Sequence, residues 1–120
     1  MNNELAKYNV YLFDLDGTVY SGSRPIESSI TYIKLLIKQN KQVVFVTNNA
    51  TVTAEYVKIK LEQFGLTLDT LHFVSSGVVT AFVLKKEAIQ KAYIIGAEAL
   101  IGYCKEQGIM HTDNEPEAVV

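Results

Sequence analysis

The sequence contains one cysteine, Cys104, no tryptophan, and no excess of basic over acidic residues. A single cysteine excludes an intramolecular disulfide, and the N-terminus lacks the pattern of a signal peptide, so we expect a reducing, cytoplasmic setting. Eleven lysine and arginine residues against thirteen acidic residues give a net charge of −2, which argues against nucleic acid as a partner. No apolar run approaches the roughly 20 residues of a membrane span, which argues against a membrane partner.

The composition is that of a globular protein. Hydrophobic residues make up 48% of the 120 positions and charged residues 20%, which excludes a disordered chain and allows at most one domain. Apolar runs of strand length alternate with segments in which apolar residues recur at helical spacing. We expect strands over 10–13, 42–46 and 92–95, with a brief apolar run over 71–74, and a further strand opening at 117–120. We expect helices over 25–39, 53–64, around 78–83 and over 97–108.

This alternation predicts an α/β fold, with a Rossmann-like parallel sheet and helices on both of its faces. The run Val10 to Phe13 has the β-branched and aromatic character of a buried strand. In such sheets the ligand site lies beyond the carboxyl ends of the strands. Two unusual polar stretches fall at that end, one after each of the first two long strands.

The first polar stretch contains a pair of carboxylates. Asp14 and Asp16 are two residues apart, so on an extended backbone their side chains point to the same side, and Gly17 behind them permits a sharp turn. Two like charges held close together are best explained by a cation between them, and Mg²⁺ prefers one or two carboxylates with water and substrate oxygens. The alternative is an ordinary turn with solvated acidic residues.

The second polar stretch is Thr47-Asn48-Asn49, directly after the apolar run Val43 to Val46. A hydroxyl and two carboxamides at a strand end, next to a helix N-terminus, can hold an anion without adding charge. A helix cap followed by a turn is the alternative interpretation. The two stretches together favour a site for an anion and a metal ion.

These residues resemble a known family, the haloacid dehalogenase superfamily of phosphotransferases. Phe13 to Tyr20 (FDLDGTVY) is similar to its first motif, and Val46 to Ala50 (VTNNA) is similar to its second. The Thr-Asn-Asn form, the run Leu15 to Gly22 and the segment Tyr93 to Gly96 resemble the NagD-like and p-nitrophenylphosphatase-like subfamily. Its members carry a large α/β cap after the third strand of the core.

The resemblance implies a magnesium-dependent phosphatase that acts on a small phosphate monoester through an aspartyl-phosphate. Asp14 would be the nucleophile, and Asp16 the acid and then the base. Mg²⁺ would be bound by the Asp14 carboxylate and the Asp16 main-chain carbonyl. The phosphate would be held by Thr47, by Asn48 and Asn49, and by N–H groups of the turn that includes Gly17 and Thr18.

The family's third motif supplies a lysine and its fourth supplies further acidic metal ligands, and both follow the cap. We therefore expect residues 1–120 to form the N-terminal part of the core domain, ending where the cap begins. In the superfamily sheet two later strands lie beside the first, so that strand should be an exposed edge here and the chain should self-associate.

Two other functions remain open. A receiver-like domain would also accept a phosphoryl group on an aspartate, and a non-catalytic fragment would only bind Mg²⁺, phosphate or a partner subunit. The remaining reactive side chains have ordinary interpretations: His72 and His111 as surface or packing residues, Cys104 as a core residue, and Lys85, Lys86, Lys91 and Lys105 as surface residues of the helices.

Overall fold

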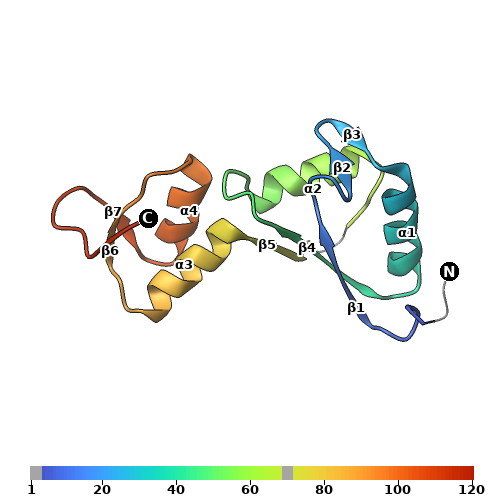
Figure 1. Cartoon of the computed structure of the whole chain (residues 1–120), viewed down its shortest axis with the longest axis horizontal. Helices are drawn as coiled ribbons and strands as arrows, with labels where there is room; N and C mark the ends of the chain where they lie inside the picture. The colour runs from blue at the N-terminus through green and yellow to red at the C-terminus, as the bar shows by residue number, and fades with distance from the viewer. Residues whose placement is uncertain (1–3, 69–71) are drawn as a thin grey trace. The chain divides into compact units, whose positions relative to one another are not determined.

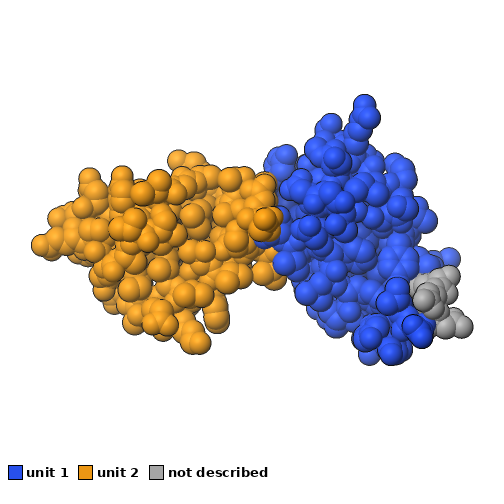
Figure 2. All heavy atoms as spheres, in the orientation of Figure 1, with its two compact units in different colours: residues 1–47, 54–73 blue, residues 48–53, 74–120 orange. Residues whose placement is uncertain are grey.

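The computed structural model describes residues 4–68 and 72–120, which form two compact units (Figure 2). Unit 1 comprises the described residues within Met1–Thr47 and Ala54–Phe73, and unit 2 comprises Asn48–Thr53 and Val74–Val120. The expected range 1–120 thus divides into two bodies, and each is described by itself. No described helix is both long enough and apolar enough to cross a membrane.

Unit 1 is built on a three-stranded sheet in the order β1-β4-β5, with β1 at Val10–Asp14, β4 at Gln42–Thr47 and β5 at His72–Ser75 (Figure 1). β1 and β4 are parallel, with Tyr11 opposite Val43 and Phe13 opposite Phe45. Helix α1 (Glu27–Lys38) connects these two strands, and helix α2 (Ala54–Gln63) follows β4. The predicted parallel α/β architecture is therefore confirmed.

One face of this sheet is buried. α1 turns its apolar stripe inward, so that Ile30, Ile33 and Leu36 are at most 2% exposed. Its Tyr32 ring meets the ring of Tyr11 edge-on, with the centroids 6.4 Å apart. Each aliphatic side chain buried in this way stabilises the fold by roughly 1.5–3 kcal/mol.

The opposite face of β1 is open. Side chains alternate along the strand, so Val10 and Leu12 point away from the buried face and are 46% and 67% exposed. The prediction of a buried first strand is therefore wrong on one face: in the described residues β1 is the edge of its sheet, as we expected. We also predicted helices on both faces of the sheet. Among the described residues, a helix covers only one face of β1.

A short hairpin links β1 to α1. Its strands, β2 (Tyr20–Ser21) and β3 (Arg24–Pro25), are antiparallel, and the N–H of Ile26 closes the hairpin by donating to the carbonyl of Val19 at 2.9 Å. Pro25 was expected as the first residue of the helix. It lies instead in β3, opposite Tyr20, because the chain stays extended through Ile26.

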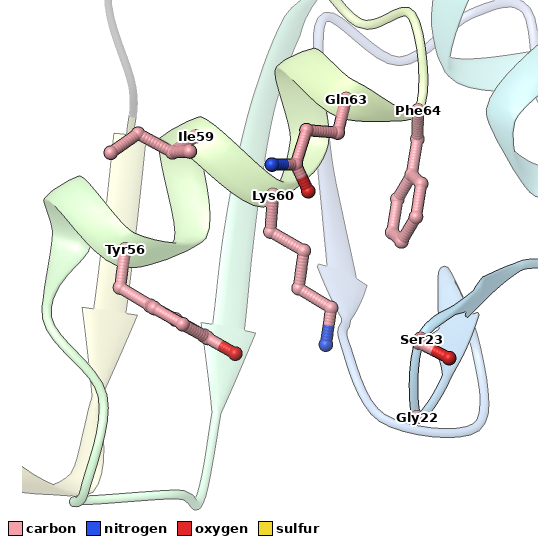
Figure 3. Close-up of a pocket in the computed structure, with 7 residues that line it drawn as sticks. All are labelled: Gly22, Ser23, Tyr56, Ile59, Lys60, Gln63 and Phe64. Carbon is pink, nitrogen blue, oxygen red and sulfur yellow. The ribbon is translucent and has the colours of Figure 1, made fainter.

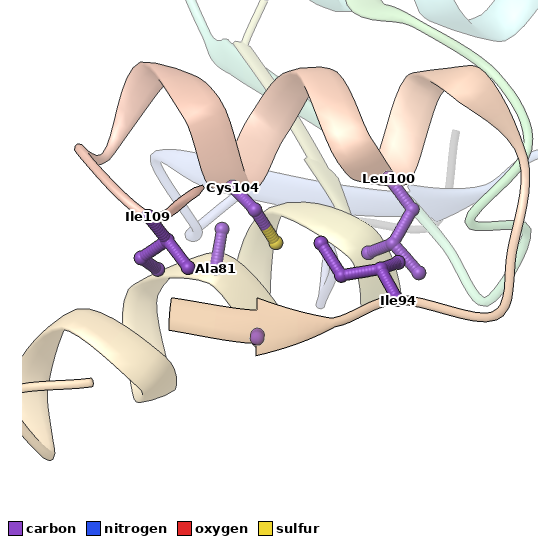
Figure 4. Close-up of a cluster of buried hydrophobic side chains, with 6 residues drawn as sticks. Ala81, Ile94, Leu100, Cys104 and Ile109 are labelled. Carbon is purple, nitrogen blue, oxygen red and sulfur yellow. The ribbon is translucent and has the colours of Figure 1, made fainter. Parts of the chain in front are cut away.

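Unit 2 has a sheet of its own, in the order β7-β6-β8, with β6 at Lys91–Tyr93, β7 at Met110–His111 and β8 at Ala118–Val119. Both neighbours run parallel to β6. Helices α3 (Ser76–Lys86) and α4 (Glu98–Glu106) bury a cluster (Figure 4) made of Ala81, Ala92, Ile94, Leu100, Cys104 and Ile109.

The expectation of one sheet that includes residues 92–95 is corrected by this arrangement. The third strand of the first sheet is β5, whereas β6 belongs to the separate sheet of unit 2. The first residue of the brief apolar run at 71–74 lies outside the described residues, and the rest of this run lies in β5. The outer face of the unit 2 sheet is open, with Ile95 71% and Val119 68% exposed, so this unit too has helices over only one face.

Candidate functional site

The acidic turn follows β1 directly. Asp14 is the last residue of the strand, and both Asp14 and Asp16 are exposed, while Leu15 between them is fully buried. The Leu15 side chain anchors the turn, and its carbonyl accepts hydrogen bonds from the N–H groups of Thr18 (3.1 Å) and Val19 (2.9 Å). The turn therefore presents two carboxylates to solvent from a fixed backbone.

Gly17 lets the chain reverse within this turn. Its φ is +83°, a conformation that residues with a Cβ rarely adopt, and its N–H donates to the Tyr20 carbonyl at 2.7 Å. The Thr18 carbonyl accepts a hydrogen bond from the Ser29 hydroxyl of α1 at 2.6 Å. The backbone N–H groups of Gly17 and Thr18 are thus engaged inside the turn.

The end of β4 lies beside the acidic turn. Asp14 is opposite Val46 in the parallel register, so the next residue, Thr47, follows at the adjacent strand end. Thr47 is 4% exposed although it is polar. Of the predicted site residues, unit 1 therefore brings together Asp14, Asp16, Gly17, Thr18 and Thr47.

The two asparagines belong to unit 2 and have local structural contacts there. The Asn48 carbonyl accepts a hydrogen bond from the Ser76 hydroxyl at 2.8 Å. The Asn49 side-chain carbonyl accepts from the N–H of Thr51 at 2.9 Å and from its hydroxyl at 2.5 Å. For Asn49 this geometry agrees with the alternative interpretation, a polar turn before a helix.

Tyr20 was not among the residues that we predicted for the site. It is 3% exposed. Its ring contacts the Lys60 ammonium, which lies 3.7 Å from the ring centroid, and the ring of Phe64, with the two centroids 5.9 Å apart. Burial, followed by the negative charges of Asp16, Tyr56 and Asp14, raises the pKa of Tyr20 to about 12. Its position within the first motif was the only signal in the sequence that it belongs to the site.

The described residues contain no group of three or more histidine, cysteine, aspartate or glutamate side chains placed to hold a metal ion. The acidic turn offers two exposed carboxylates and the carbonyls of an ordered backbone. This oxygen donor set fits Mg²⁺, which keeps several waters and takes only one or two carboxylates from the protein.

Two of the other reactive side chains, those of His111 and Cys104, have packing roles. The His111 Nδ1 accepts the N–H of Ile94 at 3.1 Å, and the His111 ring stacks on Tyr93 with the centroids 5.7 Å apart. Cys104 is fully buried, and burial raises the pKa of its thiol, so it is the core residue that we predicted. Lys85, Lys86 and Lys105 are exposed, as predicted. Lys91 was expected on a helix surface, but it is half-buried and is the first residue of strand β6.

The chain is similar to known proteins over most of its length. A family model described as haloacid dehalogenase-like hydrolase matches residues 11–110. An acid sugar phosphatase of Staphylococcus saprophyticus is 33% identical over 112 residues, which cover 92% of this chain and 43% of the relative.

Two solved structures share the fold. A 4-nitrophenylphosphatase of Thermotoga maritima has a TM-score of 0.85 and 28% identity, and the match covers 96% of this chain and 44% of that one. A glycerol phosphate phosphatase of Mycobacterium tuberculosis, solved in complex with magnesium, has a TM-score of 0.82 and 28% identity, with coverage of 93% and 35%. The chain thus spans less than half the length of these relatives, and it belongs to the haloacid dehalogenase-like hydrolase family.

Proposed function

We propose that this chain carries the nucleophile half of a magnesium-dependent phosphatase that hydrolyses small phosphate monoesters. The observation that carries the proposal is the acidic turn, in which Asp14 and Asp16 are exposed at the end of β1 beside the end of β4. The phosphatase names of the relatives support the same reaction class.

In the proposed reaction a carboxylate oxygen of Asp14 attacks phosphorus, the bond to the ester oxygen breaks, and an aspartyl-phosphate forms. Asp16 in its acid form donates a proton to the departing oxygen. In the second step Asp16 takes a proton from the water that attacks phosphorus, so that phosphate leaves and Asp14 is restored. Thr47, with backbone N–H groups of the acidic turn, would hold the phosphate oxygens.

Mg²⁺ is the cofactor that we propose, held by the Asp14 carboxylate and the Asp16 main-chain carbonyl. When bound, it would offset the repulsion between the anionic nucleophile and the anionic ester. The magnesium complex of the Mycobacterium tuberculosis relative supports this choice of metal. Two protein ligands hold Mg²⁺ weakly, so we expect further ligands from residues outside this chain.

The division into units suggests a domain assignment. We infer that β1, β4 and β5 belong to the N-terminal part of the catalytic core and that the part of unit 2 from Ser76 onward begins the cap, because β5 is the third strand of the first sheet. This moves the expected start of the cap from the end of the chain to about Ser76. We also keep the proposal of a cytoplasmic location, which depends on the single cysteine.

Phosphate release from p-nitrophenyl phosphate tests the proposal, with the 120-residue chain and with the product of its complete reading frame. We expect the complete protein to require Mg²⁺ and to lose activity to background in Asp14→Asn. The matched control is Asp113→Asn, the same change at an exposed residue of the loop between β7 and β8, which should keep full activity. Activity of Asp14→Asn near that of the control would remove Asp14 as the nucleophile.

The 120-residue chain alone should show little turnover, since loss of a preorganised electrostatic partner costs about 10²–10³-fold. Binding without any turnover, even in the complete protein, would instead favour a non-catalytic module. A phosphorylated Asp14 that persists would favour the receiver-like alternative.

A further inference from the structure

Unit 1 contains a pocket of about 450 Å³ between α2 and the turn of the β2–β3 hairpin (Figure 3). This volume lies within the range of roughly 300–1,000 Å³ that small-molecule sites occupy. The hairpin turn contributes Gly22 and Ser23, and the ring of Phe64 points toward this turn.

One face of α2 forms the other wall. The residues that line the pocket from this helix recur at i, i+3, i+4 and i+7, the spacing of a single helical face, and are Tyr56, Ile59, Lys60 and Gln63. Tyr56 and Ile59 are 53% and 50% exposed, so this face offers apolar surface that helix packing has left uncovered. Flat organic groups pack well on such a wall.

The charge of the pocket comes from Lys60. No acidic residue lines it, and among the described residues the contact of the Lys60 ammonium is the face of the Tyr20 ring, 3.7 Å from its centroid, rather than a carboxylate. A cation held on an aromatic face keeps its remaining hydrogen-bond donors for an anion. The pocket therefore combines apolar walls with one lysine that contacts no carboxylate in the described part of the chain.

Tyr20 connects this pocket to the acidic turn. Its ring contacts Lys60 and Phe64, both of which line the pocket. Its backbone carbonyl accepts the N–H of Gly17 at 2.7 Å, and Tyr20 forms a β-bridge with Asp16. One residue thus links the candidate site to the pocket.

We propose that this pocket receives the organic part of the phosphate ester and that the ester carries a second anionic group, which Lys60 binds. The proposal rests on the proposed function of the acidic turn, which holds the phosphate. It predicts a substrate class: small esters with a flat or apolar body and a carboxylate or second phosphate at the far end. Lys60 is then a residue that determines specificity and takes no part in bond breaking.

Two esters that differ in one carboxylate test the proposal. Affinities of 4-carboxyphenyl phosphate and phenyl phosphate are measured by ligand-observed NMR with Mg²⁺ and the 120-residue chain. We expect the carboxylate to tighten binding about fivefold, the value of a partly exposed ion pair near 1 kcal/mol. Lys60→Met should remove this advantage while it keeps the aliphatic stem, and Lys60→Arg should retain it.

Lys58→Met is the matched control, because Lys58 lies on the same helix but does not line this pocket. It should keep the preference for the carboxylate. Equal affinity of the unaltered chain for the two esters, or an unchanged preference in Lys60→Met, would overturn the proposal. Circular dichroism of each variant checks that α2 is intact.

A third probe separates this proposal from the proposed function. 4-Hydroxybenzoate lacks a phosphate, so it should bind in a Lys60-dependent way with or without Mg²⁺, and also to Asp14→Asn. If Asp14→Asn of the complete protein still releases phosphate at the unaltered rate, the proposed function fails, while the benzoate titration still tests the pocket proposal. If benzoate binding does not depend on Lys60, the pocket proposal fails alone.

Discussion

The Lys60 ammonium lies over the ring of Tyr20, 3.7 Å from its centroid, and joins α2 to the turn that follows β1. These two residues are forty positions apart in the sequence. The sequence pattern did not indicate that they contact each other. Tyr20 is almost fully buried, so its phenol must remain neutral for this packing to persist.

The raised pKa of Tyr20 predicts a loss of stability in alkali. The folded-state pKa of about 12 exceeds the usual 10.0, so the unfolded chain gives up its proton first and the free energy of unfolding falls as pH rises between these values. The loss should reach on the order of 1–2 kcal/mol once solvent screening is allowed for. Urea unfolding below pH 10 and near pH 12 measures it.

Tyr20→Phe should reduce this alkaline loss, whereas Tyr8→Phe, at a 51% exposed tyrosine, should leave it unchanged. The same fall in Tyr20→Phe as in the unaltered chain would show that another group is responsible.

Asp16 should matter most for esters with poor leaving groups. Proton donation is worth about 10²–10⁴-fold for an alkoxide and little for p-nitrophenolate. In the complete protein, Asp16→Asn should therefore slow the first step with a sugar phosphate far more than with p-nitrophenyl phosphate. Pre-steady-state measurement of that step is required, because Asp16 is also expected to act in the second. Equal losses on both substrates would contradict the acid role.

The hydroxyl of Tyr32 is buried without a hydrogen-bond partner among the described residues. An unsatisfied buried hydroxyl costs about 1–3 kcal/mol, so Tyr32→Phe should leave the free energy of unfolding unchanged or raise it. Its ring neighbour Tyr11 provides the contrast, because the Tyr11 hydroxyl donates to the Leu5 carbonyl at 2.5 Å. Tyr11→Phe should lower stability. A clear loss in Tyr32→Phe by thermal unfolding would reveal a partner for its hydroxyl.

Glu117 should make unit 2 sensitive to acid. Its carboxylate accepts the N–H groups of Gln90 (2.8 Å) and Lys91 (2.9 Å), and these hydrogen bonds lower the pKa of Glu117 below its usual value of 4.5. A lowered pKa contributes stability that is present above pH 4.5 and is lost as pH falls through the folded-state pKa.

Glu117→Gln should weaken protection of the Gln90 and Lys91 amides in hydrogen exchange at neutral pH. It should also reduce the acid dependence of this protection. Glu115→Gln, two residues away on the same exposed loop, is the control. Unchanged exchange in Glu117→Gln would mean that the carboxylate adds nothing to the loop.

The open face and free edge of β1 predict self-association. Leu12 is 67% exposed on a strand that has a neighbour on only one side, an arrangement that invites pairing with a second chain. Leu12→Lys should shift the 120-residue chain toward monomer in sedimentation velocity. Phe82→Lys removes a 63% exposed side chain from helix α3 and should change the distribution less. A monomeric unaltered chain would refute the prediction.

The helices and the acidic turn could be predicted because their signals are local. Ile30, Ile33 and Leu36 recur at helical spacing and are buried in α1, and Gly65 closes the turn after α2 with a φ of +84° while Leu66 packs inward at 1% exposure. Asp14 and Gly17 are three positions apart in one motif, so their proximity needs no tertiary information.

The division into two sheets could not be predicted in this way. β5 and β6 are both short apolar runs, and nothing within them tells which sheet each will join. The contact of Lys60 with Tyr20 was missed for a related reason, since a lysine at the edge of an amphipathic helix face usually lies in solvent. Only the hairpin between β1 and α1 brings the ring under the ammonium.

The loop Asn48–Thr53 has a consequence for the order of events on the ribosome. Its backbone is held by the hydroxyls of Ser76, which donates to Asn48, and of Tyr103, which donates to the Val52 carbonyl at 3.0 Å across 51 positions. At roughly 5–20 residues per second, Tyr103 is synthesised about 3–10 s after Val52. The acidic turn after β1 can therefore form early in translation, whereas the loop with Asn48 and Asn49 must wait for α4 before it acquires the hydrogen bonds described here.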